Sequence, residues 1–193
     1  MGKGRLEAFS DGVIAIIITI MVLELKVPHG VQVGDLRPLV PVLLAYAMSF
    51  VYVAIYWNNH HHMLHAVSHV DGAVMWANMH LLFWLSLIPF VSGWFGEHPG
   101  EPVPVGAYGC VLTMCGVAWM ILQFALVRLH GRDSQFATAV GRDRKGKLTQ
   151  LVLVAGLVLT FFTPLISVAL YAVVAMIWLV PDRRFGRVPE HPS

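Results

Sequence analysis

Three long stretches of the chain, residues 38–57, 73–95 and 103–127, contain no Asp, Glu, Lys or Arg. A helix of about 20 apolar residues is long enough to span the hydrocarbon core of a bilayer. In lipid, only helices and closed barrels satisfy every backbone hydrogen bond, and these stretches lack the alternating pattern of barrel strands. Charged residues make up 12% of the chain, against about a quarter in soluble domains. The sequence therefore predicts an all-α membrane protein embedded in the lipid bilayer.

The number of helices follows from the spacing of the apolar stretches. We predict six transmembrane helices, at residues 5–27, 37–58, 71–95, 103–129, 147–163 and 165–181. The last two come from one uncharged stretch, residues 148–180, which we divide at Pro164 because proline disfavours a continuous helix. Residues 1–181 are then one six-helix transmembrane domain, and residues 182–193 form a cytoplasmic tail.

The basic residues predict which end of the helices faces the cytoplasm. With six spans and a cytoplasmic N-terminus, the outer loops hold two of the 13 basic residues, Lys26 and Arg37. Because Lys and Arg are enriched in cytoplasmic loops, both termini are expected inside the cell. We interpret the basic runs as orientation signals and not as a nucleic-acid surface. The expected location is the plasma membrane, which in a bacterium is the inner membrane.

The first predicted helix has two different faces. Ile16, Thr19 and Leu23 are spaced i, i+3 and i+7, so they share one face, and Gly12 and Ile20 lie close to it. This stripe is uncharged and contains a single hydroxyl group. Its spacing alone is equally typical of a surface that packs on other helices or faces lipid. The function of the stripe is therefore left open by the helical pattern.

Asp11 begins the apolar run of the first helix and points to another side. At about 100° per residue, it lies about 140° around the helix from Ile16. An acid at membrane depth is costly and usually has a polar partner inside the protein. Candidate partners are residues 57–60, Asn78 and His80, while a helix cap or an interfacial salt bridge is the alternative. We expect a contact that fastens the first helix to the second and third.

Four short motifs occur in order in the first three predicted helices. They are Arg5-x-x-x-Phe9-Ser10-Asp11, Tyr56-Trp57-x-x-His60-His61, Trp76-x-Asn78 and Leu87-Ile88-Pro89-Phe90. Together they resemble the signature of the endolysosomal transmembrane potassium channel family, in its prokaryotic single-repeat members. The resemblance covers the first three helices, and the helix number and topology of the remainder agree with it.

The resemblance implies a homotetramer of six-helix subunits whose first helices line a central pore. The permeant ion would be K⁺, no cofactor would be required, and hydrophobic constrictions would replace a carbonyl selectivity filter. The pore-lining residues implied are Ile16, Thr19 and Leu23, and we predict Gly12 and Ile20 with them because they lie close to the same face. The structural signature network implied, which holds the first helix in place, consists of Arg5, Phe9, Ser10, Asp11, Trp57, His60 and Asn78.

A histidine cluster at residues 60–69 supports a different hypothesis. His61, His65 and His69 recur at i, i+4 and i+8, and histidines spaced i, i+4 on a helix can bind zinc or a similar metal. Paired histidines inside a membrane can also hold haem. Asp71 is the only acid close to the cluster in sequence. The alternative function is therefore a metal- or haem-binding membrane protein, whereas solvated surface histidines would require no function at all.

A small cation transporter and an enzyme are two further functional classes to compare with a channel. A small cation transporter would use helices broken at Pro89 and Pro164, but such transporters are usually built from repeats, and none is visible here. An enzyme is not expected, because the sequence has no phosphate-binding loop, no Ser/His/Asp order and no carboxylate pair at catalytic spacing.

Overall fold

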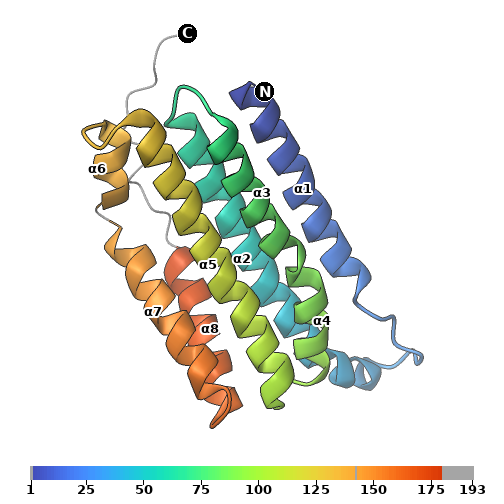
Figure 1. Ribbon diagram of the computed structural model, residues 1–193. Helices are drawn as coiled ribbons and strands as arrows, with labels where there is room; N and C mark the ends of the chain where they lie inside the picture. The colour runs from blue at the N-terminus through green and yellow to red at the C-terminus, as the bar shows by residue number, and fades with distance from the viewer. Residues whose placement is uncertain (1, 142, 180–193) are drawn as a thin grey trace.

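The computed structural model describes residues 2–141 and 143–179, and these residues form helices and connecting loops without any strand. The elements are α1 (Lys3–Leu23), the 3₁₀ helix η1 (Val33–Leu39), α2 (Val40–His65), α3 (Gly72–Ser86), α4 (Ile88–Glu97), α5 (Pro102–His130), α6 (Gln135–Gly141), α7 (Arg144–Leu159) and α8 (Pro164–Leu179) (Figure 1). The predicted cytoplasmic tail, residues 182–193, lies outside the described residues.

Four helical stretches are long and apolar enough to cross a membrane: Lys3–Leu23, Val33–His65, Gly72–Glu97 and Pro102–His130. They correspond to the first four predicted spans. The predicted hairpin is present as α7 and α8, which are separated at residues 160–163, immediately before Pro164. Each of these two helices has 16 residues. At about 1.5 Å per residue they are about 24 Å long, shorter than a hydrocarbon core of about 30 Å.

Three predicted helix boundaries are wrong. The first helix ends at Leu23, before residue 27, because Pro28 disfavours helical backbone in the residue before it. The second continues past residue 58 to His65, since polar Asn and His residues end an apolar pattern without breaking a helix. The third is divided at Leu87 into α3 and α4, because Pro89 cannot donate a backbone hydrogen bond within the helix.

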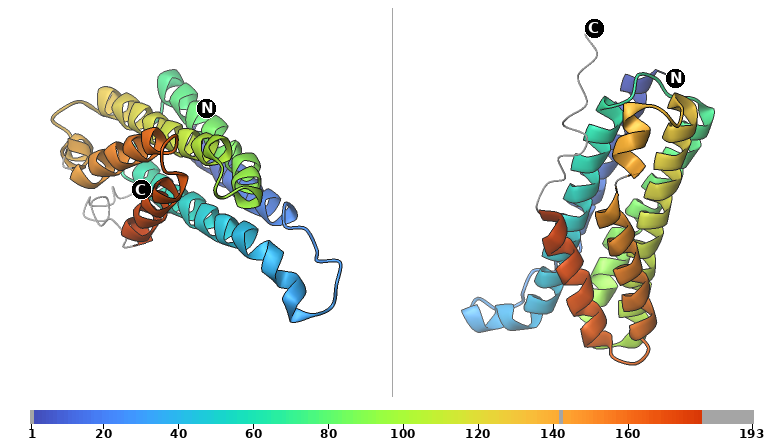
Figure 2. Two further views of the ribbon diagram at one scale, coloured as in Figure 1. Left: turned by 90° about the horizontal axis from the view of Figure 1, so that it is seen from below. Right: turned by 90° about the vertical axis from the view of Figure 1, so that its left-hand side faces the viewer.

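Helix α1 lies at one edge of the bundle, and α7 and α8 lie at the opposite edge (Figures 1 and 2). α1 packs against α2, α3 and α4 only on one side. The centre of the bundle is filled by fully buried side chains from α2, α3 and α5, including Leu64, Leu81, Leu85, Tyr108 and Leu122. This arrangement leaves the other side of α1 uncovered in a single chain.

Buried polar contacts and small residues fix α2 against its neighbours. Ser49 Oγ donates to Ser92 Oγ at 2.8 Å, and Tyr52 OH donates to the carbonyl of Tyr171 at 2.7 Å. These bonds join α2 to α4 and α8, where lipid offers no competing hydrogen-bond partner. Gly96 permits a close approach of α4 to α2, since a Cβ at this position would lie 2.9 Å from Val42 Cα. The platform on which α1 packs is therefore tightly connected.

Candidate functional site

One face of α1 is exposed along most of the helix. Its residues are Gly12, Ile16, Thr19, Ile20 and Leu23, and we call them the open face of α1. Ile16 is 58% exposed and Leu23 is 80% exposed, and a Cβ at Gly12 would meet no atom within 4 Å. The opposite face is buried through Leu6, Ile14, Ile17 and Met21. The stripe singled out in the sequence is thus the side of α1 that no other part of the described chain covers.

Thr19 is the only side-chain hydroxyl on the open face of α1. Its Oγ1 donates to the backbone carbonyl of Ile16 at 2.9 Å, one turn earlier in the same helix. Because a hydroxyl oxygen has two acceptor lone pairs, this internal bond uses the proton and leaves the oxygen able to accept. The open face therefore presents an acceptor oxygen within an apolar surface.

The buried side of α1 is held by a chain of hydrogen bonds that we call the Ser10 relay. Asn78 Nδ2 donates to Ser10 Oγ at 2.9 Å, and Asn78 Oδ1 lies 2.7 Å from His60 Nε2. Ser10 Oγ in turn donates to the carbonyl of Leu6 at 2.8 Å. All three relay side chains are 0% exposed. Since an amide oxygen only accepts, His60 must carry its proton on Nε2.

The Ser10 relay joins three helices at one level of the bundle. Ser10 belongs to α1, His60 to α2 and Asn78 to α3. Buried polar groups with partners of this kind specify one arrangement, because any displacement leaves a donor without an acceptor. The relay therefore fixes the position of α1 relative to α2 and α3.

Asp11 has a separate partner on the rim of the relay. Its Oδ1 accepts a hydrogen bond from Trp57 Nε1 at 3.0 Å, at an exposed position. Trp57 was one of the candidate partners expected for Asp11, together with nearby Asn and His residues. His80, another candidate, instead accepts from Trp84 Nε1 at 2.9 Å. Asp11 thus links α1 to α2, as expected, but among the described residues it makes no hydrogen bond to α3, which was expected as well.

Two members of the implied network stand apart from the rest. Arg5 and Phe9 are exposed, Phe9 to 46%, and within the described residues no hydrogen bond joins the Arg5 side chain to the Ser10 relay. Both lie on the same side of α1 as part of its open face. In a single chain, five of the seven residues implied by the resemblance therefore make hydrogen bonds to one another, whereas Arg5 and Phe9 are exposed on the surface of α1.

A groove runs beside the open face of α1. It has a volume of about 800 Å³ and lies between α1, the start of α2 and α4. Its lining includes Ile16, Ile20, Phe90 and Trp94. An ion pair between Lys26 and Glu97 lies in the same groove, and this hydrogen-bonded charge raises the pKa of the Lys26 ammonium above its ordinary value. The groove is mainly apolar and borders the open face directly.

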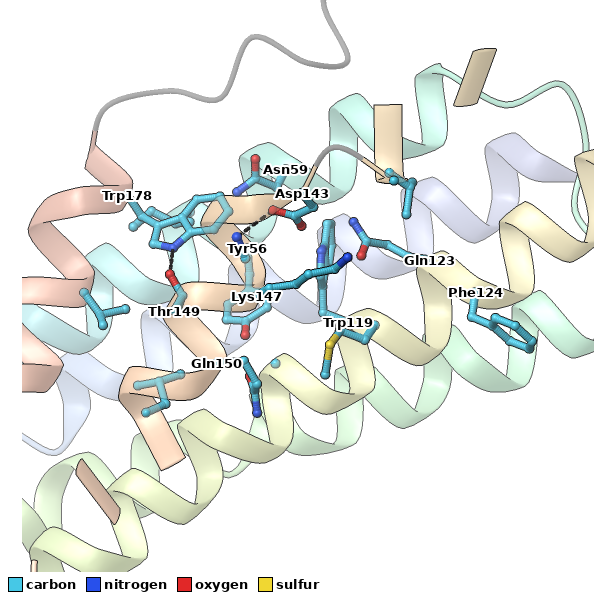
Figure 3. A pocket seen from close by; sticks show the side chains of 18 of the residues that line it. Tyr56, Asn59, Trp119, Gln123, Phe124, Asp143, Lys147, Thr149, Gln150 and Trp178 are labelled. Atoms are coloured by element: carbon cyan, nitrogen blue, oxygen red, sulfur yellow. Dashed lines mark hydrogen bonds between the residues drawn. The ribbon is translucent and has the colours of Figure 1, made fainter. Parts of the chain in front are cut away.

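A second cavity lies on the far side of α2. It has a volume of about 390 Å³ and is lined by residues of α2, α5, α6, α7 and α8 and by Asp143. Its lining includes Tyr56, Trp119, Gln123 and Trp178 (Figure 3). Trp178 Nε1 donates a hydrogen bond to Thr149 Oγ1 at 2.8 Å. No residue of α1 lines this cavity. It is therefore separate from the open face and from the Ser10 relay.

The predicted histidine stripe is only partly present. His61 and His65 lie on α2, but the helix ends at His65, so His69 belongs to the following loop and its ring lies 4.8 Å from that of His130. The expectation of an i, i+4, i+8 stripe on one helix is therefore wrong. Sequence reasoning also missed Glu7, whose Oε1 lies 3.3 Å from both His61 Nδ1 and His65 Nε2. Its distance in sequence hid a contact that the antiparallel course of α1 and α2 creates.

The geometry can be compared with known proteins. The family model described as endosomal/lysosomal potassium channel TMEM175 matches residues 5–89. A potassium channel of Chryseobacterium sp. (strain P1-3) is 50% identical over 187 residues, which is 97% of this chain and 97% of that protein. A potassium channel of Streptomyces collinus is 35% identical over 134 residues, 65% of each chain. These bacterial relatives are similar to this chain beyond the matched family segment.

Structural and vertebrate comparisons agree with the bacterial ones. The crystal structure of a lysosomal potassium-selective channel TMEM175 homolog from Chamaesiphon minutus has a TM-score of 0.80 and 27% identity, covering 92% of this chain and 96% of that one. The endosomal/lysosomal proton channel TMEM175 of Gallus gallus is 27% identical over 170 residues, but these cover 34% of its length. Because the Chryseobacterium relative shares half of its residues over nearly the whole of both chains, this protein belongs to the family of the endosomal/lysosomal potassium channel TMEM175.

Proposed function

We propose that this protein is a potassium channel in which four copies surround a pore lined by the open face of α1. The observation that carries the proposal is the open face itself, an uncharged and exposed helix surface with one hydroxyl at Thr19. A helix that lines a pore needs a face that its own subunit leaves uncovered, and an uncharged apolar face can gate ion passage by excluding water. The names of the Chryseobacterium and Streptomyces relatives support K⁺ as the permeant ion.

The groove beside α1 supports the assembly. In a closed ring of identical subunits, one surface of each copy meets a different surface of the next copy. The groove between α1 and α4 is mainly apolar, has a volume of about 800 Å³, and borders the open face. The next copy of α1 is an apolar helix that suits this position. Four copies arranged in this way would place four open faces around one axis.

The gate in this proposal is a ring of Ile16 side chains. Aliphatic side chains that surround a narrow pore oppose ion passage by excluding water, so a small change in radius switches conduction. Leu23 and Ile20 extend the apolar wall towards the end of α1, and Gly12 widens the path at its beginning. The 58% exposure of Ile16 in one chain is the surface available for this ring.

Selectivity in this proposal depends on Thr19. Its hydroxyl proton is used by the carbonyl of Ile16, so the oxygen faces outward as an acceptor. Four such oxygens, one helical turn from the Ile16 ring, would replace part of the hydration shell of a passing cation. The Ser10 relay would keep the four α1 helices at a constant distance from the axis, since it fixes each to α2 and α3.

Orientation follows from the distribution of charge. Lys3 and Arg5 at the start of α1 lie at the same end of the bundle as Arg128 in the last turn of α5 (Figure 1). Lys26 and Arg37 lie at the other end, near η1. We place the first end in the cytoplasm of the cell, on the basis of the enrichment of basic residues in cytoplasmic loops. Six spans in the plasma membrane, with α7 and α8 as the last two, complete this topology.

The test is ion flux from proteoliposomes that contain the purified protein. We expect K⁺ efflux that exceeds Na⁺ efflux under the same gradient, and a mass of the detergent-solubilised complex that equals four chains. Proton flux is measured in parallel with a pH-sensitive dye, because the vertebrate relatives are named as proton channels. Flux that saturates with ion concentration would identify a carrier and overturn the channel proposal, and a dimeric or monomeric mass would overturn the assembly.

A further inference from the structure

Three side chains with metal-binding atoms converge where α1 begins and α2 ends. Glu7 Oε1 lies 3.3 Å from His61 Nδ1 and 3.3 Å from His65 Nε2, and all three atoms lie within 4.8 Å of one another. Neither the open face of α1 nor the Ser10 relay includes these residues. We propose that Glu7, His61 and His65 form a binding site for Zn²⁺, which we call the Glu7 site.

The distances agree with the geometry of zinc. Zinc binds His nitrogen and carboxylate oxygen at about 2.0–2.1 Å and prefers a tetrahedral arrangement. Two ligand atoms at the corners of such a tetrahedron are about 3.3 Å apart, by simple trigonometry from these bond lengths. Both contacts from Glu7 already have this separation. The two imidazole nitrogens lie within 4.8 Å of each other. Metal binding therefore requires only that these two nitrogens move closer together.

The surroundings of the site are arranged to receive a cation. The Glu7 side chain is 17% exposed, whereas those of His61 and His65 are 41% and 58% exposed, so an ion can enter from solvent. Lys3, the nearest ammonium along α1, donates to the carbonyl of Val67 at 2.9 Å and is thus directed to the loop after α2. Among the described residues, the close partners of the half-buried carboxylate are therefore imidazoles and not an ammonium.

Trp57 holds the His61 ring in position. The two rings are stacked with their centroids 6.2 Å apart and their planes 26° apart. The same tryptophan donates to Asp11, one turn after Glu7 on α1. A metal at the Glu7 site would therefore add a third fastening between α1 and the helices that support it, next to the Asp11 contact and the Ser10 relay.

The ligand set favours zinc over the common hard cations. Mg²⁺ and Ca²⁺ bind oxygen ligands, and this site offers one carboxylate and two imidazoles. Two histidines and one glutamate leave a fourth position for water, which is the ligand number of open zinc sites. Histidines spaced i, i+4 on one helix are also the spacing used by zinc-binding helices. Cu²⁺ and Ni²⁺ suit the same donors and are included as competitors.

The test measures Zn²⁺ binding to the full chain in detergent, purified without a histidine tag. Titration calorimetry and metal analysis after desalting should give one Zn²⁺ per chain. The double variant His61→Ala/His65→Ala should lose at least about 100-fold in affinity, and Glu7→Gln about 10-fold or more, because each removes a direct ligand. Co²⁺ in place of Zn²⁺ should give the intense visible absorption of a tetrahedral site in the unmodified protein and lose it in the double variant.

The matched control removes two other histidines from the same end of the molecule. His62→Ala/His69→Ala leaves the Glu7 site intact, and its affinity should stay within about threefold of the unmodified protein. Saturating Zn²⁺ should also raise the melting temperature of the unmodified protein and of this control by about 4–10 °C, because a metal that binds only the folded chain stabilises it. Equal loss of binding in both double variants, or full binding without His61 and His65, would overturn the site. These readouts do not use ion flux, so they fail or succeed independently of the channel proposal.

Discussion

Replacement of Asn78 by Ala tests whether the Ser10 relay holds α1 in place. Asn78 is 0% exposed, and its amide group is the central member of the relay. Its Nδ2 donates to Ser10 Oγ at 2.9 Å, and its Oδ1 accepts from His60 Nε2 at 2.7 Å. Ala at this position removes both bonds and leaves the neighbouring helices in place around a small void.

The expected loss in the free energy of unfolding follows from the polar groups that Asn78→Ala leaves without hydrogen-bond partners. Ser10 Oγ still donates to the carbonyl of Leu6, so it remains satisfied. His60 Nε2 loses its only acceptor, and His60 Nδ1 already has no hydrogen-bond partner among the described residues. A buried donor without an acceptor costs about 1–3 kcal/mol, and the void adds about 1 kcal/mol. We therefore expect Asn78→Ala to lower the free energy of unfolding by about 2–4 kcal/mol.

The assay is thermal unfolding of the purified protein in detergent. For a chain of this length the loss corresponds to a decrease in melting temperature of about 4–16 °C. Ser10→Ala should cost about 1–3 kcal/mol, because it leaves Asn78 Nδ2 buried without an acceptor. Ser86→Ala is the matched control, since Ser86 Oγ donates to the carbonyl of Phe83 at 2.7 Å in a comparable bond but at an exposed position. Its effect should stay within about 0.5 kcal/mol.

A double-mutant cycle separates the relay from independent contacts. Because Ser10→Ala already removes the acceptor of Asn78, the second substitution should cost less in that background, by about 0.5–3 kcal/mol. Two results would refute the reasoning. One is an Asn78→Ala melting temperature equal to that of Ser86→Ala. The other is strict additivity of Ser10→Ala and Asn78→Ala.

Three further substitutions test the pore and the platform behind it. Ile16→Asn should raise K⁺ flux in proteoliposomes, because a polar ring no longer excludes water, and unchanged flux would remove Ile16 from the constriction. Thr19→Ala should lower the K⁺ over Na⁺ permeability ratio measured from reversal potentials, and an unaltered ratio would exclude its role in selectivity. Gly96→Ala should destabilise the fold by about 1–3 kcal/mol, since the new Cβ would lie 2.9 Å from the backbone of Val42. Gly93→Ala is its control, because the nearest atom to that Cβ is 3.7 Å away, and equal destabilisation by both would show that the close contact is not the cause.

Helical spacing predicted that the stripe residues of α1 share one face, but it left open whether that face is packed or uncovered. Ile16, Thr19 and Leu23 share a face because of the 3.6-residue period, and this face is the one left exposed. The partner of Asp11 was among the polar residues named as candidates in the second and third helices. The partners of Ser10 were suggested by the resemblance, since nothing in local spacing connects residue 10 to residue 78. Sequence reasoning found the relevant residues in this way, but the order of donors and acceptors required the structure.

The remaining differences arise from contacts between segments distant in sequence. Glu7 and His65 meet only because α1 and α2 run in opposite directions and α2 extends beyond its apolar part. The apolar pattern marked the membrane-spanning part of that helix and gave no signal for its polar last turns. The division at Leu87 was missed, because Pro89 was considered as a helix break only for a transporter, whereas a proline disrupts the backbone hydrogen bonds of a helix in any protein.

Block of K⁺ flux by a charged thiol reagent tests most directly whether the open face of α1 lines the ion path. The background carries Ala at Cys110 and Cys115, the two native cysteines. In Thr19→Cys, a positively charged methanethiosulfonate reagent should abolish most of the K⁺ flux from proteoliposomes. In Met176→Cys, whose exposed position on α8 lies at the opposite edge of the bundle, the reagent should leave the flux unchanged. Full flux after treatment of Thr19→Cys, or equal block of both variants, would contradict a pore lined by α1.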